Sequence, residues 1–122
     1  RVLLVEDNEI NQEIAKAMLR HLNIEHDLAQ NGREAVRMVL AGSYDAVLMD
    51  VYMPVMDGMS ATKEIRNHAK IGKKPLPIIA MTAVTLPETV DEIMHSGMND
   101  HIAKPVNLAA LRKKLAYWLN LS

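Results

Sequence analysis

The sequence predicts an α/β fold in which a parallel sheet carries helices on both faces. Short apolar segments recur along the 122 residues and alternate with longer segments whose apolar residues return every three or four positions. The short segments are typical of strands buried on both faces, and the longer ones of amphipathic helices. Because consecutive parallel strands need right-handed crossovers, this alternation predicts a single doubly wound (βα)5 domain.

The first strand and the first helix set the pattern. Val2–Val5 is an apolar run too short for a helix, and Glu6 follows it. The helix expected over about residues 9–22 carries apolar residues at helical spacing: Ile10, Ile14, Met18 and Leu22. Ala15 and Leu19 widen its apolar arc to about 200°, whereas a surface helix needs a stripe of only ~100°. We therefore expect either a deeply buried helix or an apolar edge that meets a partner.

Glycine, proline and polar capping residues separate the remaining predicted elements. These elements are an edge strand over 25–30, a helix over 35–40, a strand over 46–50, a helix over 58–69, a strand over 78–82, a helix over 87–96, a strand over 101–103 and a helix over 108–119. The borders are Asn31-Gly32, Gly42, Asp57-Gly58, a loop over 72–77, a capping box from Thr85 to Glu88, Gly97 and Asn107. The positions of the glycine, proline and capping residues agree with the element borders that the apolar periodicity predicts, which supports this order of elements.

Composition excludes several classes of protein. A formal net charge of −1 gives no general attraction to nucleic acid or to an anionic membrane. The chain has no cysteine, which excludes disulfide and thiolate chemistry and fits a reducing compartment such as the cytoplasm. No apolar run approaches the ~20 residues that span a bilayer, so we expect no membrane contact by this domain. The segment begins with Arg1 rather than Met, and we expect it to be part of a longer chain.

Acidic residues stand where predicted strands end. Glu6 and Asp7 follow the first strand, and Asp50 ends the third. Ligand sites in such sheets lie beyond the carboxyl ends of the strands, where the strand order reverses. If the first and third strands are neighbours, three carboxylates meet, and each pair at ~5 Å repels by roughly 3 kcal/mol at an effective dielectric of ~20. This arrangement requires cations, and Mg²⁺ (with Mn²⁺ as a substitute) fits an oxygen donor set.

Two further residues at strand ends complete the parts needed for phosphoryl transfer. Thr82 ends the fourth strand, and Lys104 follows the fifth. In this hypothesis Asp50 attacks phosphorus and becomes an acyl phosphate. Mg²⁺ and Lys104 offset charge on the equatorial oxygens, and Thr82 donates a hydrogen bond to them.

Each of these residues also has an ordinary structural explanation. The Glu6-Asp7-Asn8 segment could cap the first helix, and Asp50 could form a turn. Thr82 could be a plain strand end and Lys104 a plain surface lysine. Their shared position at the carboxyl ends of separate strands, with none at the opposite ends, favours a functional site. The five histidines show no ligand spacing with one another.

These residues together resemble the receiver domains of two-component phosphorelay signalling, most of all those attached to hybrid sensor histidine kinases. The likeness runs over essentially the whole chain and rests on Glu6-Asp7-Asn8 with Asn11, Asp50, the run from Met53 to Gly58, Thr82-Ala83, the run from Gly97 to Asp100, and Lys104-Pro105. It implies one receiver domain over residues 1–122, with the flavodoxin-like strand order 2-1-3-4-5. The parent chain would be a hybrid protein-histidine kinase, with the inner membrane as a possible anchor.

The resemblance implies a role for each site residue. Asp50 takes a phosphoryl group from a phosphohistidine on a kinase or histidine phosphotransfer domain. The implied metal ligands are Asp7, Asp50, the Tyr52 backbone carbonyl and, through a water molecule, Glu6. Lys104 pairs first with the carboxylate and then with the phosphate, and the Lys104-Pro105 peptide is cis. The isolated domain catalyses only its own phosphorylation and dephosphorylation.

The resemblance also implies a switch and two surfaces. Thr82 moves toward the phosphoryl group, and His101 turns inward in the fifth strand. The face made by the fourth helix, fifth strand and fifth helix then changes, and it could also form a dimer. The expected docking surface for the histidine donor consists of Ile10, Ile14, Ala15, Leu19 and Pro105.

Two positions depart from the family pattern. His101 stands where Tyr or Phe is usual, so pH sensitivity of the switch is a hypothesis, because histidine titrates near neutral pH. Tyr52, with the apolar Val84, is bulkier than the polar residues common at its position. We predict that both shield the acyl phosphate from hydrolysis.

Other functions remain open from sequence alone. A free-standing receiver, or one from a regulator with a different output, would share every motif. A Mg²⁺-dependent aspartyl phosphatase would carry its nucleophile in an Asp-x-Asp motif after the first strand. A flavin-binding module would need a phosphate loop there, where Glu6 and Asp7 would repel phosphate.

Overall fold

The computed structural model describes residues 1–51, 53, 55–68, 76–83 and 86–120. Its elements are β1 (Val2–Val5), α1 (Glu9–His21), β2 (His26–Ala29), α2 (Gly32–Ala41), β3 (Ala46–Asp50), α3 (Gly58–Asn67), β4 (Ile78–Thr82), α4 (Pro87–His95), β5 (Asp100–Ala103) and α5 (Leu108–Trp118). All strand pairs are parallel, in the order β2-β1-β3-β4-β5. The predicted (βα)5 fold and strand order are confirmed.

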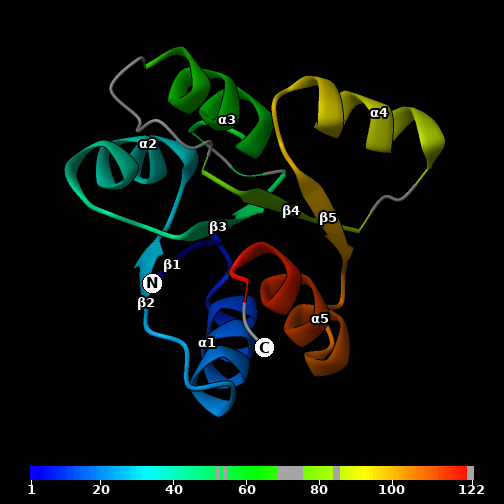
Figure 1. Ribbon diagram of the computed structural model, residues 1–122. Helices are drawn as coiled ribbons and strands as arrows, with labels where there is room; N and C mark the ends of the chain where they lie inside the picture. Colours follow the sequence, from blue (N-terminus) through cyan, green and yellow to red (C-terminus); the bar gives the residue numbers. More distant parts are fainter. Residues whose placement is uncertain (52, 54, 69–75, 84–85, 121–122) are drawn as a thin grey trace.

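The sheet is the middle of three layers. Figure 1 shows α1 and α5 against one face and α2, α3 and α4 against the other. Successive strand residues point to opposite faces, so Leu3 packs toward α2 and α3 while Leu4 packs toward α1 and α5. Every residue of β1, β3 and β4 is buried, as strands covered on both faces require.

Side chains cap the starts of four helices. Asn8, Asn31, Asp57 and Asn107 each accept a hydrogen bond from a backbone N–H in the first turn of the helix that follows. Helix α4 differs, because Leu86 precedes it without a side-chain cap and Pro87 occupies the first turn. The predicted start of this helix at proline is confirmed, whereas the capping contact predicted for Thr85 lies outside the described residues. Ala69 and most of the predicted loop over 72–77 also lie outside the described residues.

Helix α1 does not bury the face that carries its two isoleucines, although their apolar side chains predict that it would. Gln12, Ala15 and Leu19 face the sheet, whereas 71% of Ile10 and 48% of Ile14 remain exposed. At 3.6 residues per turn, the two isoleucines lie on the side of the helix away from the sheet. The prediction that Ala15 and Leu19 belong to a docking surface is wrong, because both are core residues. The surplus apolar edge that the sequence predicts consists of Ile10 and Ile14.

The segment before and at the start of β5 ties three elements together. The side-chain oxygen of Asn99 accepts hydrogen bonds from Arg66 Nη2 at 2.7 Å and from the Ile78 amide at 2.9 Å. Arg66 Nε also donates to the Gly97 carbonyl at 3.0 Å. These contacts join α3, β4 and the α4–β5 connection at the end of the sheet opposite Asp50.

Asp100 makes a second network, which holds α5 against β5. Its carboxylate accepts hydrogen bonds from Lys114 Nζ at 2.8 Å, from Trp118 Nε1 at 2.9 Å and from the His101 amide at 2.8 Å. Burial by itself raises the pKa of Asp100, but these hydrogen bonds and the charge of Lys114 outweigh burial and lower it. The ionised form is therefore the one that the fold stabilises.

We expect the Asp100→Asn variant to lose stability in a pH-dependent way. A carboxyl group with a lowered folded-state pKa contributes stability above its unfolded pKa of about 3.9, and this contribution disappears as the pH falls through the folded value. The stability advantage of the parent protein should be complete at about pH 7 and shrink below about pH 4. Urea unfolding across this range measures it. The exposed Asp91→Asn variant is the control, and a difference independent of pH would contradict the assignment.

None of the helices in the described ranges is long and apolar enough to cross a membrane.

Candidate functional site

Three carboxylates meet at the carboxyl end of the sheet. Strands β1 and β3 are neighbours, with Val5 opposite Met49, so Glu6 and Asp50, the next residue in each chain segment, lie side by side at the carboxyl end of the sheet. One carboxylate oxygen from each of Glu6, Asp7 and Asp50 lies within 4.8 Å of the others. Glu6 and Asp50 are 2% and 4% exposed, while Asp7 is open to solvent. The predicted meeting of these acids is confirmed.

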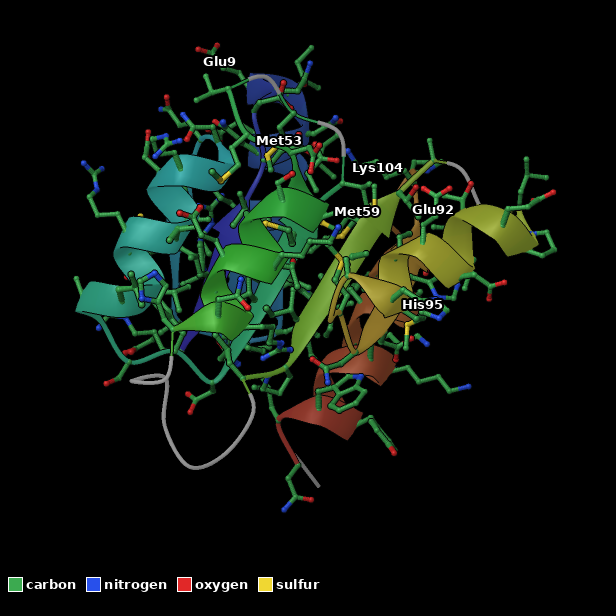
Figure 2. The ribbon with its side chains drawn as sticks, turned by 90° about the horizontal axis from the view of Figure 1, so that it is seen from above. Glu9, Met53, Met59, Glu92, His95 and Lys104 are labelled. Carbon is green, nitrogen blue, oxygen red and sulfur yellow. The ribbon has the colours of Figure 1, made fainter. Side chains whose placement is uncertain are left out.

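Lys104 reaches this cluster from the connection that follows β5. Its Nζ donates a hydrogen bond to Asp50 Oδ1 at 3.0 Å and another to Glu6 Oε1 at 3.2 Å. Figure 2 shows Lys104 at the same end of the molecule as Met53, in the connection after β3, and Glu9, at the start of α1. The Lys104-Pro105 peptide is cis, as predicted. The side chain is thus a partner of the buried acids and not a plain surface lysine.

The site holds more negative than positive charge, with three carboxyl groups and one lysine. Burial raises the pKa of Glu6, and the hydrogen bond and charge of Asp50 raise it further, against the opposing effects of the Asn8 amide and Lys104. Burial lowers the pKa of Lys104, but Asp50 and Glu6 outweigh burial and raise it. Lys104 thus pairs with two of the three carboxylates, those of Glu6 and Asp50, and one positive charge faces three acidic groups. A divalent cation would supply the two positive charges that remain.

The donor set fits a hard divalent cation. All three carboxylates offer oxygen, the ligand type that Mg²⁺ prefers, and Mg²⁺ typically takes one or two carboxylates and keeps several waters. Asp7 is exposed, which leaves room for such waters and for a phosphate oxygen. Tyr52, whose carbonyl is the expected third direct ligand, lies outside the described residues.

Backbone contacts hold the connection between Asp50 and α3. The Gly58 amide donates to the Val51 carbonyl at 2.8 Å, and the Gly32 amide, at the start of α2, donates to the Met56 carbonyl at 3.1 Å. Both glycines permit a very close approach, because a Cβ on Gly58 would lie 2.1 Å from the Asp50 carbonyl oxygen and one on Gly32 would lie 2.4 Å from that of Met56. The backbone of Asp50, the phosphoacceptor candidate, is thus closely packed against the start of α3.

Thr82 and His101 lie on neighbouring strands. Thr82 is buried at the end of β4, and its carbonyl accepts a hydrogen bond from the Lys104 amide at 2.9 Å. His101 is half-buried in β5, opposite Ala80 in the register. The connection after β5 is therefore tied to the end of β4. Val84, the expected shield, lies outside the described residues.

Sequence reasoning missed Gln12. Its side chain is buried on α1, and its Nε2 donates a hydrogen bond to the Glu6 carbonyl at 2.8 Å. The signal that could have identified it is its spacing, three residues before Ala15 and seven before Leu19, on the face that the core occupies. A buried polar side chain on that face needs a hydrogen-bond partner, and here the partner belongs to the acidic connection, the segment Glu6-Asp7-Asn8 between β1 and α1.

Comparisons with known proteins agree on one family. The sequence model described as the response regulator receiver domain matches residues 2–116. The receiver domain of a Pseudomonas aeruginosa sensor histidine kinase, solved with magnesium in its active site cleft, is 44% identical with a TM-score of 0.89, over 98% of this chain and 96% of that one. The Saccharomyces cerevisiae Ssk1 receiver domain, solved with the histidine phosphotransfer protein Ypd1, is 39% identical with a TM-score of 0.92, over 98% and 88%.

Curated relatives are much longer than this chain. Histidine kinase 5 of Arabidopsis thaliana is 42% identical over 98% of this chain, which matches 16% of that protein. The oxidative stress response two-component system protein SSK1 of Candida albicans is 38% identical over 96% of this chain, which matches 22% of it. The similarity therefore concerns one domain of each relative.

Proposed function

Because this chain belongs to the response regulator receiver domain family, we propose that Asp50 accepts a phosphoryl group from a phosphohistidine in a Mg²⁺-dependent reaction. The observation that carries the proposal is the buried Asp50 carboxylate, held 3.0 Å from Lys104 Nζ beside two further acids. The family is not one of catalytic enzymes, so the domain acts as an acceptor that undergoes one transfer per cycle.

The reaction exchanges one bond to phosphorus for another. An oxygen of Asp50 forms a P–O bond as the P–N bond of the donor's phosphohistidine breaks, and the imidazole leaves with the electron pair of that bond. Asp7 and Asp50 would hold Mg²⁺ directly and Glu6 through water. When bound, the ion would offset charge on the phosphoryl oxygens.

Lys104 and Thr82 contribute to the same transfer. Lys104 Nζ already contacts Asp50, so a small movement would bring it to a phosphoryl oxygen when the carboxylate is phosphorylated. Thr82 stands at the end of β4, and its hydroxyl is the proposed donor to another of these oxygens. Since the Thr82 carbonyl binds the Lys104 amide, movement at β4 would extend to the connection after β5.

The output of the transfer is a change in the face made by α4, β5 and α5. We propose that Thr82 moves toward the phosphoryl group and that His101 turns inward in the space this frees. Exposed apolar side chains on and next to this face, including Met94 and Tyr117, are available to a partner or to a second copy of the chain. Membership of a hybrid histidine kinase and a cytoplasmic setting are parts of the same proposal.

The donor would dock on the exposed edge of α1. Ile10 and Ile14 are exposed apolar side chains on α1, the helix that follows Glu6 and Asp7 in the chain, and Pro105 is exposed next to Lys104 in the sequence. Exposed apolar side chains next to a reactive centre are typical of a protein interaction site. The Ssk1 receiver domain of yeast was solved in complex with a histidine phosphotransfer protein, which supports this class of partner.

We expect Ile14→Glu to slow transfer from a phosphotransfer protein by at least about tenfold, because a desolvated interfacial carboxylate costs more than ~1.4 kcal/mol. Labelling by a small acyl phosphate, which needs no docking surface, should be unchanged. Leu40→Glu is the control, because Leu40 is about equally exposed but lies on α2. Equal slowing by both variants would argue against docking on α1.

Incubation with a ³²P-phosphohistidine donor and Mg²⁺ tests the function. We expect stoichiometric, base-labile label on the parent protein and none on the Asp50→Asn variant or after chelation of the metal. Label that persists in the variant would refute the assignment of Asp50. Catalytic turnover of a phosphate monoester would favour the phosphatase alternative, although its nucleophile would follow β1 whereas Asp50 ends β3.

A further inference from the structure

Gln12 is a buried polar side chain without a part in the chemistry proposed above. It lies in the first turns of α1 on the face that also carries Ala15 and Leu19, and only 6% of it is exposed. Its Nε2 donates a hydrogen bond to the Glu6 backbone carbonyl at 2.8 Å. A buried amide is costly unless it is hydrogen-bonded, so this contact fixes the distance between α1 and the acidic connection.

The carbonyl that Gln12 binds belongs to the peptide group between Glu6 and Asp7. The N–H of the same peptide group donates to Glu6 Oε2 at 3.0 Å. The Asn8 amide donates to that oxygen as well, at 3.3 Å. Both polar atoms of the peptide are thus held, one by α1 and the other by the Glu6 side chain.

Asp7 depends on this peptide for its position. Its side chain is exposed, and within the described ranges no hydrogen bond or ion pair involving its carboxylate is found. The other two acids are held by Lys104. The place from which the Asp7 side chain projects is therefore set by its backbone, and the peptide before it is held by Gln12 and Glu6.

We propose that Gln12 is a positioning residue for divalent cation binding, which acts by fixing the Glu6–Asp7 peptide. This inference rests on the proposed function, in which Asp7 and Glu6 hold Mg²⁺. Mg²⁺ demands near-octahedral geometry, so a small displacement of one carboxylate weakens binding. Loss of a residue that orients a ligand typically lowers metal affinity by about 10- to 100-fold.

The test compares Gln12→Met with the parent protein in urea unfolding, with and without Mg²⁺. Methionine keeps the unbranched length of glutamine but donates no hydrogen bond. A cation that binds only the folded state raises the unfolding free energy in proportion to the logarithm of its affinity. A tenfold loss of affinity should therefore reduce the Mg²⁺-dependent increment by about 1.4 kcal/mol at saturating ion. Titration with Mn²⁺, followed by the electron paramagnetic resonance of the free ion, measures the same affinity directly.

Leu19→Val is the matched control, because Leu19 packs α1 on the core about two helical turns beyond Gln12. It should lower stability and leave the Mg²⁺ increment intact. If Gln12→Met retains the parent's affinity within about twofold, or if Leu19→Val loses as much affinity, the positioning role is overturned.

The Asp7→Asn variant separates this inference from the function on which it rests. If the parent protein binds Mg²⁺ and Asp7→Asn does not, the site is intact and the result for Gln12→Met decides the inference. If parent and Asp7→Asn both fail to bind Mg²⁺ or Mn²⁺, the proposed function itself fails.

Discussion

Replacing Gly58 with alanine is expected to lower the free energy of unfolding by about 3 kcal/mol, which is the upper end of the usual cost of adding a methyl group to a well-packed site. A Cβ at this position would lie 2.1 Å from the Asp50 carbonyl oxygen and 2.9 Å from Met49 Cγ. The first of these atoms is backbone in a central strand, so it cannot move without breaking sheet contacts. Relief must come from displacement of the start of α3, which would also loosen the backbone after Asp50 and weaken Mg²⁺ binding.

Urea unfolding measures this loss, and Gly42→Ala provides the control. Alanine at Gly42 would place its Cβ 3.2 Å from the Met38 carbonyl oxygen and from Tyr44 Cε2, a tight contact that a small adjustment can relieve. We expect a much smaller loss for this variant and no change in Mg²⁺ affinity. Similar losses at both glycines would contradict the proposed cause, because the added Cβ would lie 2.1 Å from a backbone oxygen at Gly58 but 3.2 Å from one at Gly42.

Replacing Lys104 with methionine is expected to lower the free energy of unfolding by about 3 kcal/mol in the presence of a chelator. The variant keeps the apolar stem but removes the ammonium group that Glu6 and Asp50 share. Two buried carboxylates are then left without a cation, which is more costly than loss of a surface pair. Because Mg²⁺ would bind the folded state alone, adding it should restore part of the stability.

Lys16→Met is the control for the loss of a lysine. Lys16 forms a 3.7 Å pair with Glu13 on α1, and Glu13 is mostly exposed. Such pairs contribute less than about 1 kcal/mol, so we expect a small loss that Mg²⁺ does not alter. A comparable loss in both variants, or no effect of Mg²⁺ on Lys104→Met, would show that Lys104 does not neutralise the site.

Much of the site could be predicted from the sequence because it depends on topology. In a parallel (βα)5 sheet every strand ends at the same edge, so residues that follow separate strands must converge there. Glu6, Asp50 and Lys104 follow this rule, and their contacts need only the strand order and a long lysine side chain. The cation requirement follows from their charges alone.

Local signals also predicted most of the helix borders. Asn8, Asn31, Asp57 and Asn107 cap their helices through contacts within three residues of sequence, which tertiary packing does not alter. The start of α4 at Pro87 also has a local cause, because the fixed φ and missing N–H of proline suit the first turn of a helix.

The sequence by itself thus determined the order of the elements, the parallel (βα)5 class and the residues at the strand ends, since periodicity and strand ends are local properties. The strand order was implied by the resemblance to receiver domains, and the structure confirmed it. Only the tertiary structure decided which face of α1 meets the sheet. An apolar arc wider than the buried stripe leaves that choice to packing, which selected Ala15 and Leu19 and left Ile14 exposed. The same choice buried Gln12 against the Glu6 carbonyl. Contacts between residues on different elements depend on how those elements pack, and no local pattern encodes them.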